Sequence, residues 1–224
     1  MFMKKNIIIV GSSKGLGRAL ALLLHKNNNL FLLSRKIDKA KFSQENITKI
    51  ACNITLVESI KKAFKKIDNL TKTIDVLINC VGVGLERNLE VSTDTDIKKV
   101  IETNLLGAIF ISKAVYTRML KQKRGHIINI SSTSGKKARD GETVYCASKW
   151  GLAGFTESLR LEAQKHNIRV TTVFPGGMKT DFYNNNPDKD ISGFMNPKHV
   201  AEQIVNLINS DSSICPSRLI IERA

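Results

Sequence analysis

Short runs of uninterrupted apolar residues alternate along the chain with longer stretches whose apolar residues recur at helical spacing. Ile7-Ile8-Ile9-Val10 is one such run, and Ile60, Ala63, Phe64 and Ile67 show the helical spacing. The pattern predicts strands over residues 6–10, 30–33, 47–51, 74–79, 125–131, 169–174 and 218–221. It predicts helices over 16–26, 56–70, 144–166 and 197–209, and one or two helices within 95–120.

Strands that are apolar along their whole length and separated by helices are typical of a parallel sheet covered on both faces. We therefore expect an α/β fold, a Rossmann-type doubly wound parallel sheet of about seven strands with helices on both faces. No repeat or linker divides the chain, so residues 1–224 form one predicted domain. Segment 181–196, rich in Asn, Asp, Gly and Pro, predicts neither helix nor strand.

Composition narrows the class of protein. At 42% hydrophobic and 25% charged residues, the chain resembles ordinary globular proteins and not disordered ones. Its apolar runs are too short to cross a bilayer, and the N-terminal run breaks at Gly11, so we expect a cytoplasmic protein with no membrane partner. The 35 Lys and Arg against 20 Asp and Glu give a formal charge of +15, but the lysines are spread along the chain. This spread indicates solvated helix faces, and we predict no nucleic-acid partner.

The four cysteines are Cys52, Cys80, Cys146 and Cys215. They form no C-x-x-C pair and have no histidine at metal-ligand spacing. We therefore predict neither a disulfide framework nor a metal site.

The first predicted strand leads directly into Gly11-Ser-Ser-Lys-Gly-Leu-Gly17 and then into a helix. Glycines in such a turn let the backbone approach a pyrophosphate, which the free N–H groups of the helix N-terminus then bind. The spacing G-x-x-x-G-x-G differs from the common G-x-G-x-x-G and lacks the G-K-[ST] of a P-loop. It favours a dinucleotide site, while the motif alone leaves a purely structural turn open.

Further motifs follow in order along the chain. They are Asn79-Cys-Val-Gly82 after the fourth strand, Asn104 in the next helix, Ser132 after the fifth strand, Tyr145-Cys-Ala-Ser-Lys149, and Pro175-Gly-Gly-Met-Lys-Thr180. Together with the glycine turn, this ordered set resembles the short-chain dehydrogenase/reductase family.

The resemblance implies a catalytic set of Asn104, Ser132, Tyr145 and Lys149. Tyr145 would protonate the carbonyl oxygen attacked by hydride, Ser132 would hydrogen-bond that oxygen, and Asn104 would anchor a water of the proton relay. Independently of the family, Tyr145 and Lys149 lie one helical turn apart, and an ammonium beside a phenol lowers its pKa. The alternatives are a packed tyrosine with a solvated lysine, and an asparagine that satisfies a buried backbone group.

The resemblance also implies a nicotinamide cofactor. Its predicted contacts are Gly11, Ser13, Lys14, Gly15, Leu16, Gly17, Ser34, Arg35, Asn53, Ile54, Asn79, Gly82, Tyr145, Lys149, Pro175, Gly176, Met178 and Thr180. The second strand ends at Ser34-Arg35 with no acidic residue to bond a ribose 2′-hydroxyl, and an arginine fork instead suits a 2′-phosphate. With Lys14 as a second cation, we predict NADP(H) and carbonyl reduction.

Some positions depart from the family pattern. Val10, Asn53 and Cys80 stand where the family usually has Thr, Asp and Asn, and we expect them to weaken cofactor affinity. The chain is also short in segment 181–196, which predicts a short lid and an open site.

The main functional hypothesis is an NADPH-dependent carbonyl reductase acting on a small-molecule carbonyl substrate. One alternative is a 3-oxoacyl-acyl-carrier-protein reductase whose Lys136, Lys137 and Arg139 dock the acidic carrier protein. Another is a catalytically silent NADP(H)-sensing binding protein, which has no need of the complete Ser132, Tyr145 and Lys149 set. The resemblance further implies a homodimer or homotetramer.

Overall fold

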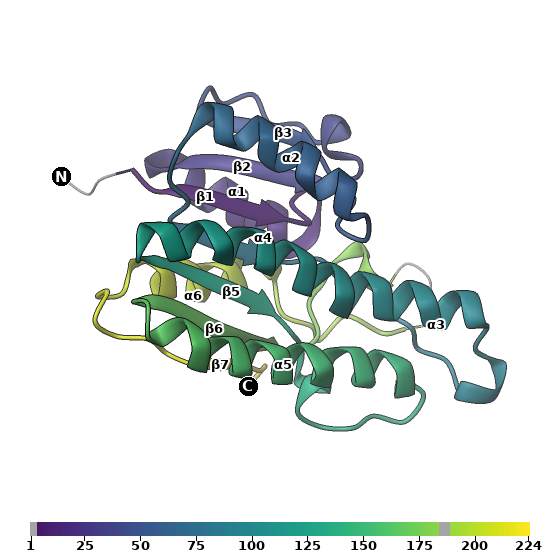
Figure 1. Ribbon diagram of the computed structural model, residues 1–224. Coiled ribbons are helices and arrows are strands. Elements are labelled where there is room, and N and C mark those ends of the chain that lie inside the picture. Colours follow the sequence, from purple (N-terminus) through teal and green to yellow (C-terminus); the bar gives the residue numbers. More distant parts are fainter. Residues whose placement is uncertain (1–3, 184–188) are drawn as a thin grey trace.

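A single parallel sheet forms the centre of the molecule (Figure 1). The computed structural model describes residues 4–183 and 189–224. All seven strands run parallel in the order β3-β2-β1-β4-β5-β6-β7. Their bounds are β1 Asn6–Val10, β2 Asn29–Ser34, β3 Ile47–Ala51, β4 Val76–Asn79, β5 Gly125–Ile130, β6 Ile168–Pro175 and β7 Arg218–Ile221. The predicted Rossmann-type fold is confirmed.

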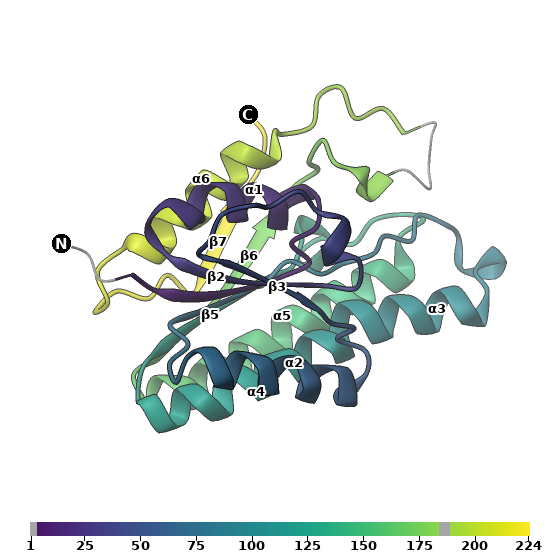
Figure 2. The same ribbon diagram turned by 90° about the horizontal axis from the view of Figure 1, so that it is seen from above.

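Helices cover both faces of the sheet (Figure 2). Helices α1 (Gly15–Leu24) and α6 (Pro197–Asn209) lie on one face. Helices α2 (Val57–Leu70), α4 (Gly107–Gln122) and α5 (Thr143–Gln164) lie on the other. The side chains of each strand therefore enter two separate cores in alternation.

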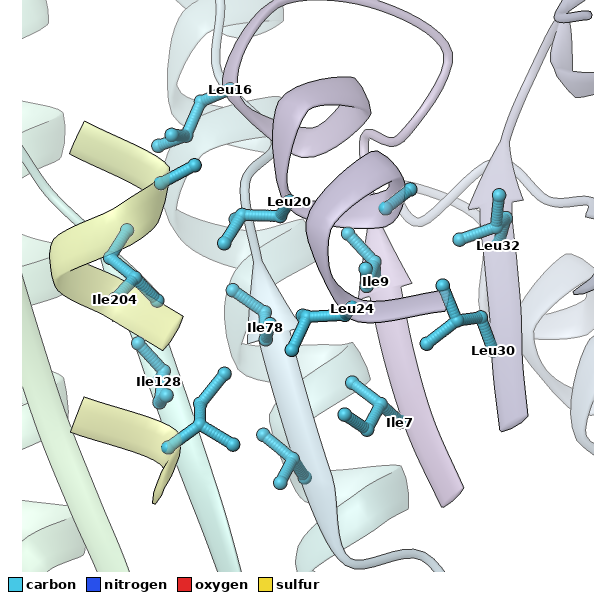
Figure 3. Close-up of a cluster of buried hydrophobic side chains, with 14 of the residues drawn as sticks. Ile7, Ile9, Leu16, Leu20, Leu24, Leu30, Leu32, Ile78, Ile128 and Ile204 are labelled. Atoms are coloured by element: carbon cyan, nitrogen blue, oxygen red, sulfur yellow. The ribbon is translucent and has the colours of Figure 1, made fainter. Parts of the chain in front are cut away.

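Strand β1 illustrates this division. Ile7 and Ile9 belong to the core beneath α1 and α6, which also contains Leu20 and Ile204 (Figure 3). Ile8, between them, points into the core under α2, α4 and α5. Each fully buried side chain of this size contributes about 1.5–3 kcal/mol, so burial on both faces favours apolar residues along the whole length of β1.

The stretch 95–120, in which one or two helices are predicted, lies in one continuous helical segment. Helix α3 (Asp94–Ile101) passes through a π-helical turn at Glu102–Leu106 into α4. Asn104 lies in this π-helical turn, a feature that often marks functional sites.

The predicted element ends agree with the structure within two residues, and the start of β4 shows one cause of such a difference. Ile74 was expected to begin the strand, but its backbone N–H and C=O bond the side chain of Gln122 at 2.9 Å and 3.0 Å. The strand therefore begins at Val76.

Two remaining expectations concern membranes and metals. Within residues 4–183 and 189–224, no helix combines the length and the apolar composition needed to cross a bilayer. The same residues contain no group of three or more His, Cys, Asp or Glu placed to hold a metal ion.

Candidate active site

A cleft of about 490 Å³ runs along the carboxyl ends of the strands. It is lined by residues that follow each of the seven strands, so it is built from segments that are far apart in the sequence. The strand order reverses between β1 and β4, and ligands of open α/β sheets bind at such a switch point. The fold thus places the sequence motifs around one cavity.

The glycine turn forms one end of this cleft. Gly11 has a φ of +79°, a left-handed conformation that favours glycine. A Cβ on Gly17 would collide with the carbonyl oxygen of Gly11, so only glycine allows the start of α1 to pack this closely on the turn. Lys14 occupies the N-cap without a side-chain cap bond. The first N–H groups of α1 are therefore suited to an anionic ligand.

The cations predicted to select the cofactor lie on the same side of the cleft. Arg35 follows β2, its side chain is exposed, and within the described part of the chain it has no ion-pair partner. Ser34 donates a hydrogen bond to Ser13 across the turn at 3.1 Å. Lys14 Nζ lies 3.8 Å from the carboxylate of Asp181, and both side chains are more than half exposed. Such a pair contributes little stability, so Lys14 remains available to a phosphate.

The proposed catalytic side chains meet at the end of the cleft opposite the glycine turn. Tyr145 and Lys149 are one turn apart on α5 and only 9% and 3% exposed. The Lys149 ammonium lies 5.9 Å from the Tyr145 ring centre and donates a hydrogen bond to the Ile130 carbonyl at 3.0 Å. Gly82 lies beside the ammonium, where a Cβ would be 3.4 Å from Lys149 Nζ. Ser132, after β5, bonds the Tyr145 hydroxyl.

Burial dominates the acid–base properties of this pair. It raises the pKa of Tyr145, and the hydrogen bond with Ser132 acts in the opposite direction. Burial also lowers the pKa of Lys149 to about 8. The sequence predicted that the lysine would lower the pKa of the tyrosine. In this structure desolvation by burial dominates and raises that pKa, and the Lys149 ammonium bonds the Ile130 carbonyl instead.

Asn104 does not line the cleft, and its side chain links the loop after β4 to helix α5. Its side-chain oxygen accepts a hydrogen bond from the Val83 N–H at 2.8 Å. Its amide donates to the Val83 carbonyl at 2.9 Å and to the Ser148 hydroxyl at 3.1 Å. The side chain therefore ties the loop after β4 to α5, next to Tyr145. Its part in a proton relay stays a prediction.

The structure brings nearly all the predicted site residues to the cleft. Only Asn79 and Asn104 of that set do not line it. Asn79 is 1% exposed and points instead toward Asn129, 3.4 Å away, in the buried layer beneath α4 and α5. Asn53, one of the departures from the family pattern, lines the cleft and accepts hydrogen bonds from the backbone N–H and hydroxyl of Thr55.

Sequence reasoning missed the aromatic residues at the end of the cleft that contains Tyr145, which we call the substrate end. Phe182, Tyr183 and Phe194 all line the cleft, although segment 181–196 predicted only a short, open lid. A short 3-10 turn covers Asp181–Tyr183, while the asparagine triplet at 184–186 lies outside the described residues. The three aromatic residues within an otherwise polar segment were the available signal. Glu142, which also lines the cleft, gave no such signal.

Comparisons with known proteins agree with this arrangement. Residues 5–190 match the family model of the short chain dehydrogenases. Carbonyl reductase family member 4 of Xenopus laevis is 33% identical over 218 residues, which cover 93% of this chain and 92% of the relative. The 3-oxoacyl-(acyl-carrier-protein) reductase of Bos taurus is 34% identical over 185 residues, covering 80% and 78%. The solved structure named "ElxO with NADP Bound" has a TM-score of 0.89 and 29% identity, and 98% of each chain is covered.

The buried Lys149 predicts an unusual dependence of stability on pH. Its pKa is about 8 in the folded protein against 10.5 for an ordinary lysine. Between these values the unfolded chain holds a proton that the folded protein has released, so the free energy of unfolding rises with pH. Lys149→Met removes this contribution. We expect its free energy of unfolding, relative to wild type, to be greater at pH 7 than at pH 10 by about 2–3 kcal/mol.

Urea unfolding of both proteins at the two pH values measures this difference. Lys62→Met, on the exposed face of α2, is the control and should show no such change with pH. An equal Lys149→Met difference at pH 7 and pH 10 would contradict the burial argument.

Proposed function

The chain belongs to the short chain dehydrogenase family, and we propose that it is an NADPH-dependent carbonyl reductase. The observation that carries the proposal is the convergence of Ser132, Tyr145 and Lys149 at one end of a cleft whose other end is a glycine turn and a helix N-terminus. A dinucleotide suits a cleft with these two ends, with its phosphates at the glycine turn and its nicotinamide at Tyr145.

The chain's own residues account for the proton that carbonyl reduction requires. When bound, the nicotinamide supplies the hydride. Tyr145 transfers its hydroxyl proton to the carbonyl oxygen, completing the alcohol, and is left as a phenolate. Ser132 donates a hydrogen bond where negative charge develops on that oxygen. The ammonium of Lys149 stabilises the phenolate until solvent returns the proton.

The pKa values suit reduction at neutral pH. Because burial raises the pKa of Tyr145, the phenol keeps its proton until a stronger base, the forming alkoxide, arrives. Lys149, with a pKa of about 8, carries its charge below that pH and loses it above. Reduction should therefore decline as the pH rises through about 8.

The proposed preference for NADPH over NADH rests on Arg35 and Lys14. An arginine fork and a second cation favour the 2′-phosphate of NADPH, and β2 carries no carboxylate at its end that would repel it. The NADP in the ElxO structure is consistent with this preference.

A second candidate is 3-oxoacyl thioester reduction, because 3-oxoacyl-(acyl-carrier-protein) reductases are among the relatives. Two of the three cations expected to dock a carrier protein already have contacts. Lys136 Nζ lies 5.3 Å from the Phe174 ring centre, and Arg139 donates to the Thr133 hydroxyl at 3.1 Å. We therefore favour small-molecule ketones and include one 3-oxoacyl thioester in the substrate panel.

Removal of the proton donor tests the chemistry. Tyr145→Phe should lower kcat for ketone reduction by about 10²–10⁴-fold, the usual contribution of a positioned general acid, with little change in NADPH affinity. NADPH oxidation across a ketone and aldehyde panel measures the first quantity, and fluorescence titration of NADPH measures the second. Tyr116→Phe, on α4, is the matched control. Full activity in Tyr145→Phe would overturn the proposal, and tight NADPH binding without any turnover would favour the sensor alternative.

Removal of Arg35 tests the cofactor preference. Arg35→Ala should weaken NADPH binding about 10- to 100-fold, the equivalent of one or two charge-assisted hydrogen bonds, and leave NADH binding unchanged. Dissociation constants for both dinucleotides decide the matter, with Lys62→Ala as the control. Equal losses for NADPH and NADH would show that Arg35 does not read the 2′-phosphate.

A further inference from the structure

Four aromatic rings form a continuous row along the substrate end of the cleft, beginning at the proton donor. Tyr145 and Phe182 have ring centres 5.8 Å apart, Phe182 and Tyr183 5.2 Å, and Tyr183 and Phe194 5.1 Å. All three contacts are edge-to-face, with interplanar angles of 62–72°. We call Tyr145, Phe182, Tyr183 and Phe194 the aromatic row; each of them lines the cleft.

Two glycines on neighbouring loops hold the row in place. A Cβ on Gly84 would lie 2.8 Å from the Phe182 ring, and a Cβ on Gly177 would lie 2.7 Å from the Phe194 ring. Real side chains do not approach this closely, so only glycine at these positions lets the rings lie against the backbone. Phe182 thereby lies against the loop after β4, in edge-to-face contact with Tyr145.

Backbone bonds fix the rest of the row. The N–H of Met195 donates to the Gly177 carbonyl at 3.0 Å, and the N–H of Lys179 donates to the Met195 carbonyl at 2.9 Å. Lys189 forms an ion pair with Glu86 at 3.1 Å, joining the segment before Phe194 to the loop after β4. The row is therefore attached to the scaffold on both sides.

Nearby charged groups at this end already have partners. Glu142 accepts a hydrogen bond from Ser134 at 2.8 Å, and Arg139 donates to Thr133 at 3.1 Å. A substrate bound at Tyr145 would thus lie close to Phe182, the next ring of the row.

We propose that the aromatic row selects carbonyl substrates that carry an aryl ring, with Phe182 as the specificity-determining residue. This inference rests on the proposed reductase function and names its substrate class. Aromatic pairs gain stabilisation beyond the apolar area they bury, which corresponds to a preference of about two- to tenfold for an aryl ring over a saturated ring of the same size.

Acetophenone and cyclohexyl methyl ketone test the proposal, because they share one carbon skeleton and differ in aromaticity. The quantity measured is the ratio of their kcat/KM values. Phe182→Leu keeps an apolar side chain but removes the ring, so this ratio should fall about two- to tenfold relative to wild type. Comparison with wild type cancels the intrinsic difference in reactivity between the two ketones.

Gly84→Ala provides an independent variant that leaves Phe182 intact. Its new Cβ must displace the ring, so the ratio should fall in the same direction. Gly154→Ala, on α5, has no atom within 4 Å of the added Cβ and is the matched control, with an unchanged ratio. An unchanged ratio in both Phe182→Leu and Gly84→Ala would overturn the inference, while turnover of both ketones would leave the reductase function standing.

If neither ketone is reduced, a binding measurement tests the aromatic selection separately from the reductase function. Saturation-transfer NMR with NADP⁺ present compares binding of the same two ketones. Preferential binding of acetophenone that Phe182→Leu abolishes would support the aromatic row even though the reductase proposal had failed. Equal binding of the two ketones would overturn the aromatic selection as well.

Discussion

Burial of the sheet on both faces is the constraint on which the rest of the structure depends. Ile7 and Ile8 enter two different cores, and the polar strand residues Asn79 and Asn129 are buried and do not line the cleft. The candidate functional side chains lie instead on the loops and helix starts at the carboxyl edge, where the cleft lies. The same edge receives the N-terminus of α1 and, across the switch point, the start of α5, which brings an anion-binding turn and a proton donor into one cavity.

Burial also sets the chemistry of that cavity. Tyr145 and Lys149 are almost fully enclosed, and desolvation moves the pKa of the phenol up and that of the ammonium down, to about 8. The folded protein thus carries a charged lysine at neutral pH at a cost to its stability. Such a cost is typical of sites built for reactivity, where burial shifts the pKa of a functional group away from its ordinary value.

The sequence predicted the sheet, its helices and most of the cleft, because these follow from periodicity and ordered motifs. It failed where the outcome depends on three-dimensional proximity. Neither the hydrogen bond of Lys149 to the Ile130 carbonyl nor the burial that raises the pKa of Tyr145 can be read from a four-residue spacing. Likewise, Phe182 reaches the cleft because Gly84, far from it in sequence, leaves room for its ring.

Transfer of deuterium from NADPH labelled at the reactive C4 position tests the central claim most directly. The labelled cofactor is incubated with the enzyme and a ketone that it consumes, and the alcohol is analysed by mass spectrometry and NMR. We predict one deuterium on the former carbonyl carbon and a solvent-derived proton on the oxygen. Consumption of NADPH without deuterium in the alcohol would contradict direct hydride transfer and the role assigned to this cleft.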